Sequence, residues 1–235
     1  MQKSFRVAGL IHESVAGKTP GSLTIASESD ISVVKPQQEH TTATRSTGGV
    51  TSIPPIPPIE IARRGNRLAV RSGTGPWQCT KVKTLPASVP LPITSSPKSS
   101  SSLGGTTHIS KLANLGTETI DGTLVWHIYG ASIYVAMTKN VQKSKVQLDI
   151  YVTKSDFTVR RYSVIEISPM KKGKLTVNIT EDFSMYGEPV NVVVPAECNT
   201  VPHLGVSTPG LPLASAAPDP WTLIPQLRAF LLPAR

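Results

Sequence analysis

The stretch VQLDIYVTKSDFTVRRYSVIEI, residues 146–167, decides the fold of this 235-residue chain. Its first eight residues alternate between apolar and polar side chains, which is the pattern of a strand with one apolar face. KSDF at 154–157 then predicts a turn, and residues 158–167 predict a second strand. A parallel pair would need a longer crossover, so the two strands are expected to pair antiparallel.

The same pattern continues on the carboxyl-terminal side. KLTVNITEDF at 174–183 alternates again and predicts a third strand of an antiparallel meander. FSMYGEPVNVVVPAE at 183–197 follows, with a turn at 187–189 and a short strand expected at 190–194. Proline has no donor for a sheet, so Pro195 is expected to end that strand.

The amino-terminal side predicts further strands and hairpins. Residues 4–15 predict one strand, 21–36 one long or two short strands, and 39–46 another. Two hairpins are expected, one within 59–73 around Gly65–Asn66 and one within 116–130 around Asp121–Gly122, since such dipeptides favour two-residue turns.

Helix signals are sparse, and several stretches are unlike strands. HISKLANL at 108–115 is the best helix candidate, and 131–143 is a second. SIPPIPPI at 52–59 is expected to be extended, because proline fixes φ and removes donors. Residues 86–107 are rich in Pro and Ser and predict a low-complexity loop, which leaves residues 1–198 as one domain and 199–235 as a proline-rich, disordered tail.

The net charge of +9 is concentrated in the first hundred residues, which carry twelve Lys/Arg and five Asp/Glu. A basic region favours anionic partners such as lipid headgroups, acidic polymers or nucleic acid, and the alternative is a solvated basic surface. Proteins that bind single-stranded nucleic acid interleave aromatic and basic residues. Phe5 and Trp77 are the only Phe or Trp residues in this region, so a nucleic-acid partner is not expected.

No residue set indicates catalysis or a resident cofactor. The five histidines are all at least ten residues apart, and no His–Glu zinc motif or nucleophile elbow occurs. SGTGPW at 72–77 lacks the lysine of a phosphate loop and predicts a turn. Glu181 and Asp182 are adjacent, and neighbours on a strand point to opposite faces, so they are not expected to share a proton or a metal. We therefore expect no enzyme, cofactor or metal.

The two cysteines, Cys79 and Cys198, lie far apart in the sequence. In an exported protein they could form a disulfide, and in a reducing compartment they would stay free thiols. The sequence leaves both alternatives open.

The chain resembles the LppX/LprG-type bacterial lipoproteins, relatives of the LolA lipoprotein carrier, over about residues 4–197. The resemblance is carried by the succession SFRVAGLI, GSLTIASESDISVVKP, IEIARRGNRLAVRSGTGPWQC, LGTETIDGTLVWHIYG, VQLDIYVTKSDFTVRRYSVIEI and LTVNITEDFSMYGEPVNVVVPAE. It implies an α+β fold, in which a strongly curved antiparallel sheet forms a half-barrel with a few short helices over its concave face.

The resemblance also implies a function, which is to hold lipid or lipoprotein acyl chains between sheet and helices and carry them across the cell envelope without bond chemistry. Strand alternation selects the residues expected to line such a cavity, which are Phe5, Val7, Leu23, Ile25, Leu68, Val70, Leu124, Trp126, Val146, Leu148, Ile150 and Val152. If the wrong face of a strand is chosen, all the residues selected on that strand point away from the cavity.

The expected location is the cell envelope, with the full-length form exported and membrane-anchored. The printed chain has neither the signal peptide nor the lipobox cysteine of the family. Its basic first half could hold an anionic headgroup or rest on an anionic membrane surface. The alternative from another class is an envelope sensor or scaffold of the same fold that binds a protein partner and carries no lipid.

Overall fold

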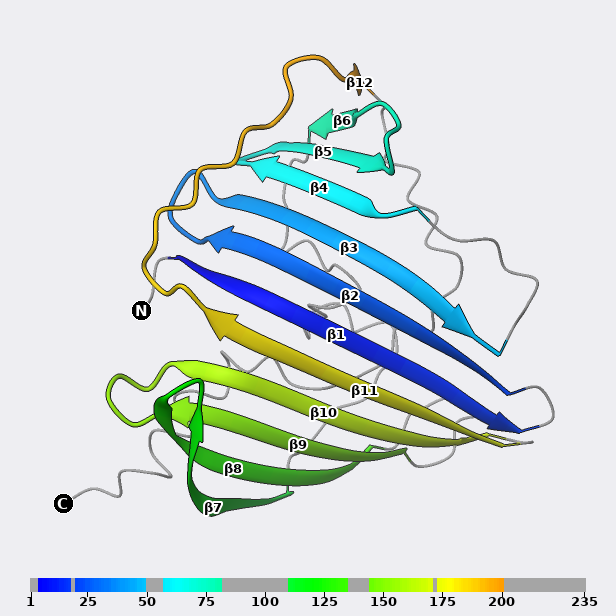
Figure 1. Cartoon of the computed structure of the whole chain (residues 1–235), viewed down its shortest axis with the longest axis vertical. Helices are drawn as coiled ribbons and strands as arrows, with labels where there is room; N and C mark the ends of the chain where they lie inside the picture. The colour runs from blue at the N-terminus through cyan, green and yellow to red at the C-terminus, as the bar shows by residue number, and fades with distance from the viewer. Residues whose placement is uncertain are drawn as a thin grey trace.

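The computed structural model describes residues 4–17, 20–49, 57–81, 110–134, 144–170 and 173–200. These residues form one twelve-stranded sheet (Figure 1). The strands are β1 Ser4–Gly17, β2 Gly21–Ser32, β3 Gln38–Gly48, β4 Ile59–Arg64, β5 Arg67–Ser72, β6 Gln78–Lys81, β7 Ser110–Ile120, β8 Thr123–Tyr134, β9 Ser144–Thr153, β10 Val159–Met170, β11 Gly173–Ser184 and β12 Asn199–Thr200. None of the described ranges contains a helix long and apolar enough to span a membrane.

The strand order is β12-β6-β5-β4-β3-β2-β1-β11-β10-β9-β8-β7. All neighbouring pairs are antiparallel except β12 and β6, which are parallel. The first strand, β1, therefore lies in the middle between β2 and β11, and it joins two meanders into one sheet. The predicted meander of β9, β10 and β11 is confirmed.

Two hairpin turns have the backbone that their sequences predict. Gly65 has φ of 60° and begins the turn between β4 and β5, which suits a two-residue turn with glycine first. Asp121 and Gly122, between β7 and β8, have φ of 47° and 74°, and a turn with both central residues at positive φ matches the twist of paired strands.

The helix predicted at 108–115 is wrong where the structure describes it. Residues 110–115 belong to β7, which pairs with β8. Register shifts beside Asn114 and Gly116 interrupt the alternation, and Gly116 has φ of 113°. This bulge hid the strand pattern, since a bulge inserts a residue and breaks the period of two. The second candidate, 131–143, begins in β8, and its residues 135–143 lie outside the described residues, as do 86–107 and 201–235.

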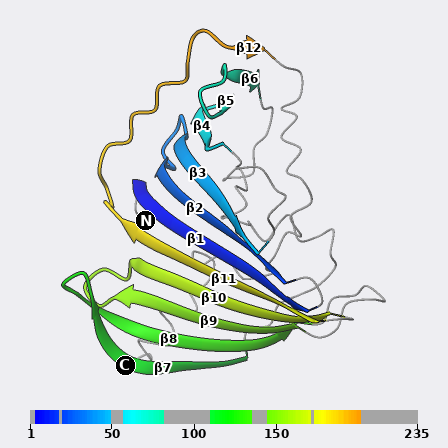
Figure 2. The ribbon, with the colours of Figure 1, turned by 45° about the vertical axis from the view of Figure 1, so that its right-hand side comes forward.

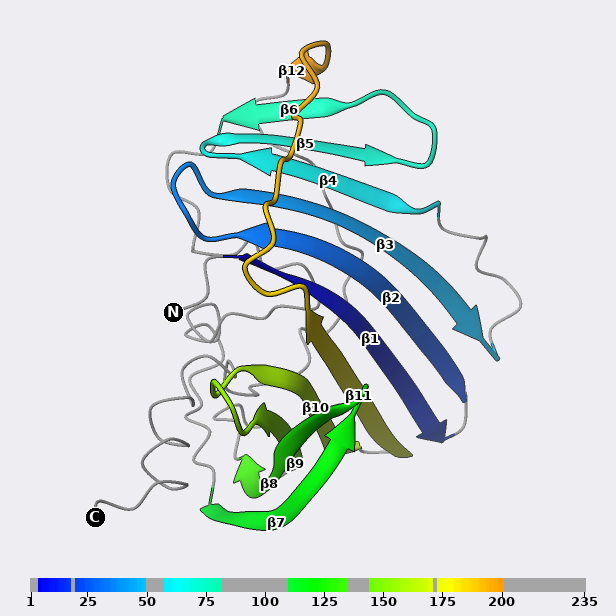
Figure 3. The same cartoon turned by 60° about the vertical axis from the view of Figure 1, so that its left-hand side comes forward.

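The short strand predicted at 190–194 is also wrong, because residues 188–195 have no regular structure. This segment leaves β11, crosses the outside of the sheet from β1 towards β6, and ends in β12 (Figure 3). We call residues 189–198 the strap. The backbone N–H of Val192 donates to the Gln38 side-chain oxygen at 2.9 Å. This N–H is therefore satisfied by a side chain of β3 and not by the backbone of a neighbouring strand.

The strap ends at a disulfide between Cys79 of β6 and Cys198, 119 residues apart in sequence. Next to it the N–H of Asn199 donates to the carbonyl of Trp77 at 2.9 Å. At the other end of the strap, the Ser4 hydroxyl donates to the Glu188 carbonyl at 2.6 Å. The strap is therefore fixed at both ends and holds the β6 edge to the centre of the sheet.

The sheet curves strongly without closing (Figures 2 and 3). Residues paired directly opposite on neighbouring strands point to the same face. We call the face that carries Val7, Ile11 and Ile179 the inner face, and the face crossed by the strap the outer face. The buried core cluster lies on the inner face. The half-barrel sheet is confirmed, whereas the described residues contain none of the expected short helices.

Replacing Gly173 by alanine is expected to destabilise the sheet by about 1–3 kcal/mol. Gly173 has φ of 150°, and a Cβ there would approach the Ala16 carbonyl oxygen to 1.9 Å. Chemical denaturation of both variants, with Gly122→Ala as the control, measures the effect. Gly122 also has a positive φ, but no atom lies within 4 Å of a Cβ built there. Gly122→Ala therefore measures the cost of the backbone conformation alone, without a steric clash. Equal losses at the two positions would contradict the prediction.

Candidate functional site

The inner face is a broad aliphatic surface assembled from most of the sheet. One row of paired residues crosses it through Ile25, Ile11, Ile179, Val164 and Leu148, on five neighbouring strands. All five are 6% exposed or less. β-branched side chains suit such a surface, because they pack well on a pleated sheet. The row is continuous, and no polar group interrupts it.

Eleven of the twelve residues predicted to line a cavity belong to the core cluster of this face or pack against it. The exception is Leu124, which is 50% exposed beside the Asp121–Gly122 turn. Alternation selected Leu124 with Trp126, but the buried zone of β8 ends before it. Leu124 is therefore not part of the buried inner face.

Several members of the face were missed by the sequence reasoning. They are Ile11, Ile61, Ile128, Val159, Tyr162, Val164, Val177, Ile179 and Phe183. The signal was present in most of them, since Ile11 continues the alternation from Val7, and Val177 and Ile179 lie on the alternating strand at 174–183. They were omitted because the prediction took only some positions from β1, β2, β5, β8 and β9 and none from β4, β10 or β11.

A buried charged pair lies on the inner face towards the β4 end. Glu39 and Arg63 are directly paired across β3 and β4 and approach to 3.7 Å, with side chains 6% and 5% exposed. Arg63 also donates to the Gln37 side-chain oxygen at 2.7 Å. Burial raises the pKa of Glu39 despite the nearby Arg63 and the hydroxyl of Thr41. Neither charge is free, and Ile31 and Leu68 lie directly opposite the pair on the neighbouring strands, so the pair is a polar spot within the apolar face.

A second row of the inner face carries two carboxylates. Glu13 and Glu166 flank Val177 on the strands beside β11. Glu166 accepts a hydrogen bond from the Ser168 hydroxyl at 3.0 Å on one oxygen, and within the described ranges its buried Oε2 has no partner. Burial raises the pKa of Glu13 against the opposing effect of Arg45. These carboxyl groups therefore border the aliphatic row in a weakly solvated position.

Replacing Glu13 by glutamine is expected to stabilise the protein at neutral pH. The folded-state pKa of Glu13 is raised above 4.5, so its ionised form is disfavoured by folding. Glu13 therefore adds to the free energy of unfolding below pH 4.5, where it is protonated. This contribution is lost as the pH rises through the folded-state pKa. Thermal unfolding of wild type and Glu13→Gln should therefore differ at pH 7 and converge in acid. The exposed Glu197→Gln serves as control, and a gap that widens in acid would contradict the prediction.

The histidines that the structure describes are held by neighbouring polar groups. His127 on the outer face contacts Glu118 at 2.7 Å and Asp149 at 2.8 Å, and it stacks on Tyr151. His40 contacts Glu60 at 2.9 Å. The described part of the chain has no group of three or more His, Cys, Asp or Glu that could hold a metal ion. His108 and His203 lie outside it.

The adjacent carboxylates of β11 point to opposite faces of the sheet, as the alternation predicts. Glu181 is 5% exposed and lies opposite Gly9 and Tyr162 on the inner face. Asp182 lies on the outer face, where Arg161 donates to it at 2.5 Å. Because the two side chains point to opposite faces, they share neither a proton nor a metal site.

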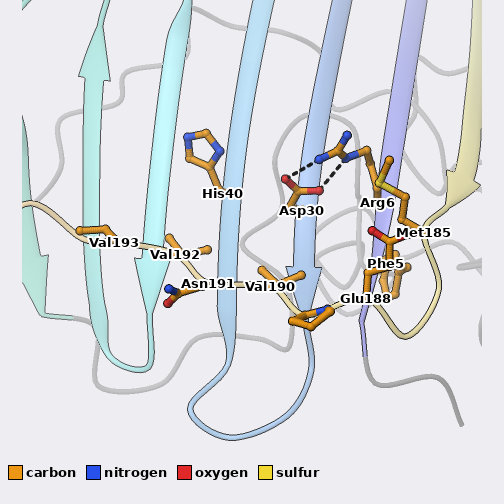
Figure 4. Close-up of a pocket in the computed structure, with 11 residues that line it drawn as sticks. Phe5, Arg6, Asp30, His40, Met185, Glu188, Val190, Asn191, Val192 and Val193 are labelled. Carbon is orange, nitrogen blue, oxygen red and sulfur yellow. Dashed lines mark hydrogen bonds and ion pairs between the residues drawn. The ribbon is translucent and has the colours of Figure 1, made fainter.

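A pocket of about 380 Å³ lies on the outer face, between the strap and β1 to β3 (Figure 4). Its floor is a row of paired residues, Arg6, Asp30 and His40. Arg6 donates to Asp30 at 2.7 and 3.0 Å and contacts Glu28 at 3.2 Å. The cation of this pocket is therefore already neutralised within the protein.

Neither a family model nor a curated protein matches the sequence. Among solved structures, lipoprotein LppX from Mycobacterium tuberculosis is similar at 16% identity and a TM-score of 0.43, over 82% of this chain and 90% of that one. LprF from Mycobacterium bovis is similar at 12% identity and a TM-score of 0.43, over 83% and 90%. LppX is a lipoprotein of the type that the sequence resembles.

Proposed function

We propose that this protein binds the acyl chains of a lipid, glycolipid or lipoprotein noncovalently against its inner face and carries them in the bacterial cell envelope. The supporting observation is the continuous aliphatic row from Ile25 to Leu148, within a core cluster spread over eight strands. Branched aliphatic residues make an apolar lining that imposes no hydrogen bonds, which suits a ligand made of methylene groups. The mechanism involves burial alone, without catalysis.

The energetics of such binding are adequate for a carrier. Each buried methylene contributes about 0.8 kcal/mol, so one long acyl chain supplies roughly the 8 kcal/mol of micromolar affinity after ordering costs. The carboxyl groups of Glu13 and Glu166 on the inner face would repel an anionic headgroup. The headgroup would therefore lie away from these two residues.

The disulfide supports an exported location. Disulfides persist in oxidising compartments and are rare in the cytosol of mesophiles. The Cys79–Cys198 bond fixes the strap, so it has a structural part in the fold. Residues 1–198 would then act as one envelope domain.

A sensor or scaffold that binds a protein partner is the second candidate. It is favoured by the close burial of the inner face, where Ile128 and Ile150 are both 0% exposed. A face that is already packed needs no ligand. The two candidates differ in whether lipid is present in the isolated protein.

Native mass spectrometry of the purified protein, followed by lipid extraction, tests the proposal. A bound lipid is expected with wild type and with Leu10→Asp, and it should be lost with Leu23→Asp. Leu23 packs partly buried against the core cluster, whereas Leu10 is 47% exposed on the outer face. Circular dichroism checks that each variant is folded.

A protein that is free of lipid and gains none from envelope lipids would favour the partner-binding candidate. Loss of lipid from both variants would also count against the inner face as the site.

A further inference from the structure

One end of the sheet gathers exposed cations and exposed apolar residues. The turn between β2 and β3 contains Val33, Val34 and Lys35, and the hairpin between β4 and β5 is flanked by Arg64 and Arg67. The two turns touch, since the N–H of Gly65 donates to the Gln37 carbonyl at 2.7 Å. Figure 1 shows both turns on the same side of the sheet, near the start of β1. We call Val33, Val34, Lys35, Arg64, Arg67 and Lys81 the basic tip.

Three cations of the basic tip form a row. Arg64 lies directly opposite Arg67, and Arg67 lies directly opposite Lys81. All three are exposed, and like charges directly opposite on a sheet are destabilising. Within the described ranges no ion pair involves them, and Arg67 donates only to the carbonyl of Pro195 at 3.3 Å. The fold therefore holds these charges together without neutralising them.

The apolar part of the tip lies next to these charges. Val33 is 41% exposed and Val34 is 47% exposed, and they precede the exposed Lys35. The strap adds one exposed carboxylate near the tip, Glu197, beside the disulfide to β6. One carboxylate does not neutralise four cations, so the tip is both basic and apolar.

We propose that the basic tip docks this protein onto the surface of an anionic lipid bilayer. Cations near an anionic surface each contribute attraction, and adjacent exposed valines can enter the boundary between headgroups and acyl chains. A nucleic acid or other polyanion would use the cations but would leave the valine pair without a role. The docking surface is separate from the inner face, and it goes beyond the proposed carrier function.

Sedimentation with lipid vesicles tests the proposal on the full chain with its disulfide intact. Wild type is expected to bind vesicles of phosphatidylcholine with about 30 mol% phosphatidylglycerol and to be released by high salt. Arg64→Gln with Arg67→Gln should weaken binding about thirtyfold, at about 1 kcal/mol per cation. Val33→Ser with Val34→Ser should also weaken binding but leave its salt dependence unchanged.

The control is Lys145→Gln with Lys174→Gln, which removes two exposed cations at the opposite end of the sheet. It should change binding by less than about threefold, because charges beyond a Debye length of the surface are screened. Equal losses in the two double variants would overturn the proposal, since only net charge would then matter. Binding to heparin without binding to anionic vesicles would overturn it in favour of a polyanionic partner.

Docking and acyl binding can fail separately. Leu23→Asp, which is expected to lose the bound lipid, should still sediment with anionic vesicles. Equal retention of wild type by pure phosphatidylcholine vesicles would contradict docking at the tip, because uptake by the inner face does not need anionic lipid.

Discussion

Replacing both cysteines by serine is expected to lower the free energy of unfolding by about 4–5 kcal/mol in the chain-entropy account of disulfides. The bond closes a loop with a sequence separation of 119 residues, and loop-closure entropy grows with loop length. It also fixes two weak elements, since β6 has four residues and β12 has two. Without it, the strap is held to the sheet by hydrogen bonds such as those of Val192 and Asn199.

Urea unfolding followed by tryptophan fluorescence measures this loss. Trp77 reports locally, because its carbonyl accepts from Asn199 and its ring lies 4.7 Å from the Arg71 guanidinium. Wild type under reducing conditions should reproduce the behaviour of the Cys79→Ser, Cys198→Ser variant. A variant within about 1 kcal/mol of wild type would contradict a structural role for the bond.

Replacing Ile150 by alanine is expected to cost about 2–5 kcal/mol, the range for truncating a fully buried aliphatic residue. Ile150 is 0% exposed and lies between Ile128 and Tyr162 on the neighbouring strands. The surrounding rows come from hydrogen-bonded strands and cannot collapse easily into the space left by the side chain.

Leu124→Ala is the matched control on the adjacent strand β8. Leu124 is half exposed, so its truncation should change stability by no more than about 0.5 kcal/mol. Thermal and denaturant unfolding of the two variants are compared directly. A similar cost at both positions would show that Leu124 belongs to the buried face after all.

The strands were predictable where the period of two is uninterrupted. β9 and β11 alternate along most of their length, and glycine or aspartate–glycine turns define the hairpins. β7 was not predictable as a strand, because the bulge near Gly116 breaks the period. The strap has the β-branched composition of a strand, but it does not form one. Pro189 and Pro195 have no backbone N–H to donate, and β11 already has β1 and β10 as its two neighbours.

The candidate face was predictable in kind but not in extent. Alternation identified which side chains share a face, and eleven of twelve choices lie together. It could not show where burial ends, which on β8 is before the half-exposed Leu124. The pairing of Cys79 with Cys198 depends on the strap crossing the outer face, which no local pattern indicates. Three cations of the basic tip, Arg64, Arg67 and Lys81, meet through the strand register, and the turn that contains Lys35 joins them through the hydrogen bond from Gly65 to Gln37.

Photo-crosslinking with a diazirine-labelled fatty acid tests acyl binding at the inner face most directly. The label should attach to inward residues of β9, such as Leu148 and Ile150, and not to the outward Gln147 and Asp149 between them. An excess of unlabelled fatty acid should abolish the reaction. Labelling spread equally over both sets, or confined to the outer-face pocket under the strap, would contradict the account.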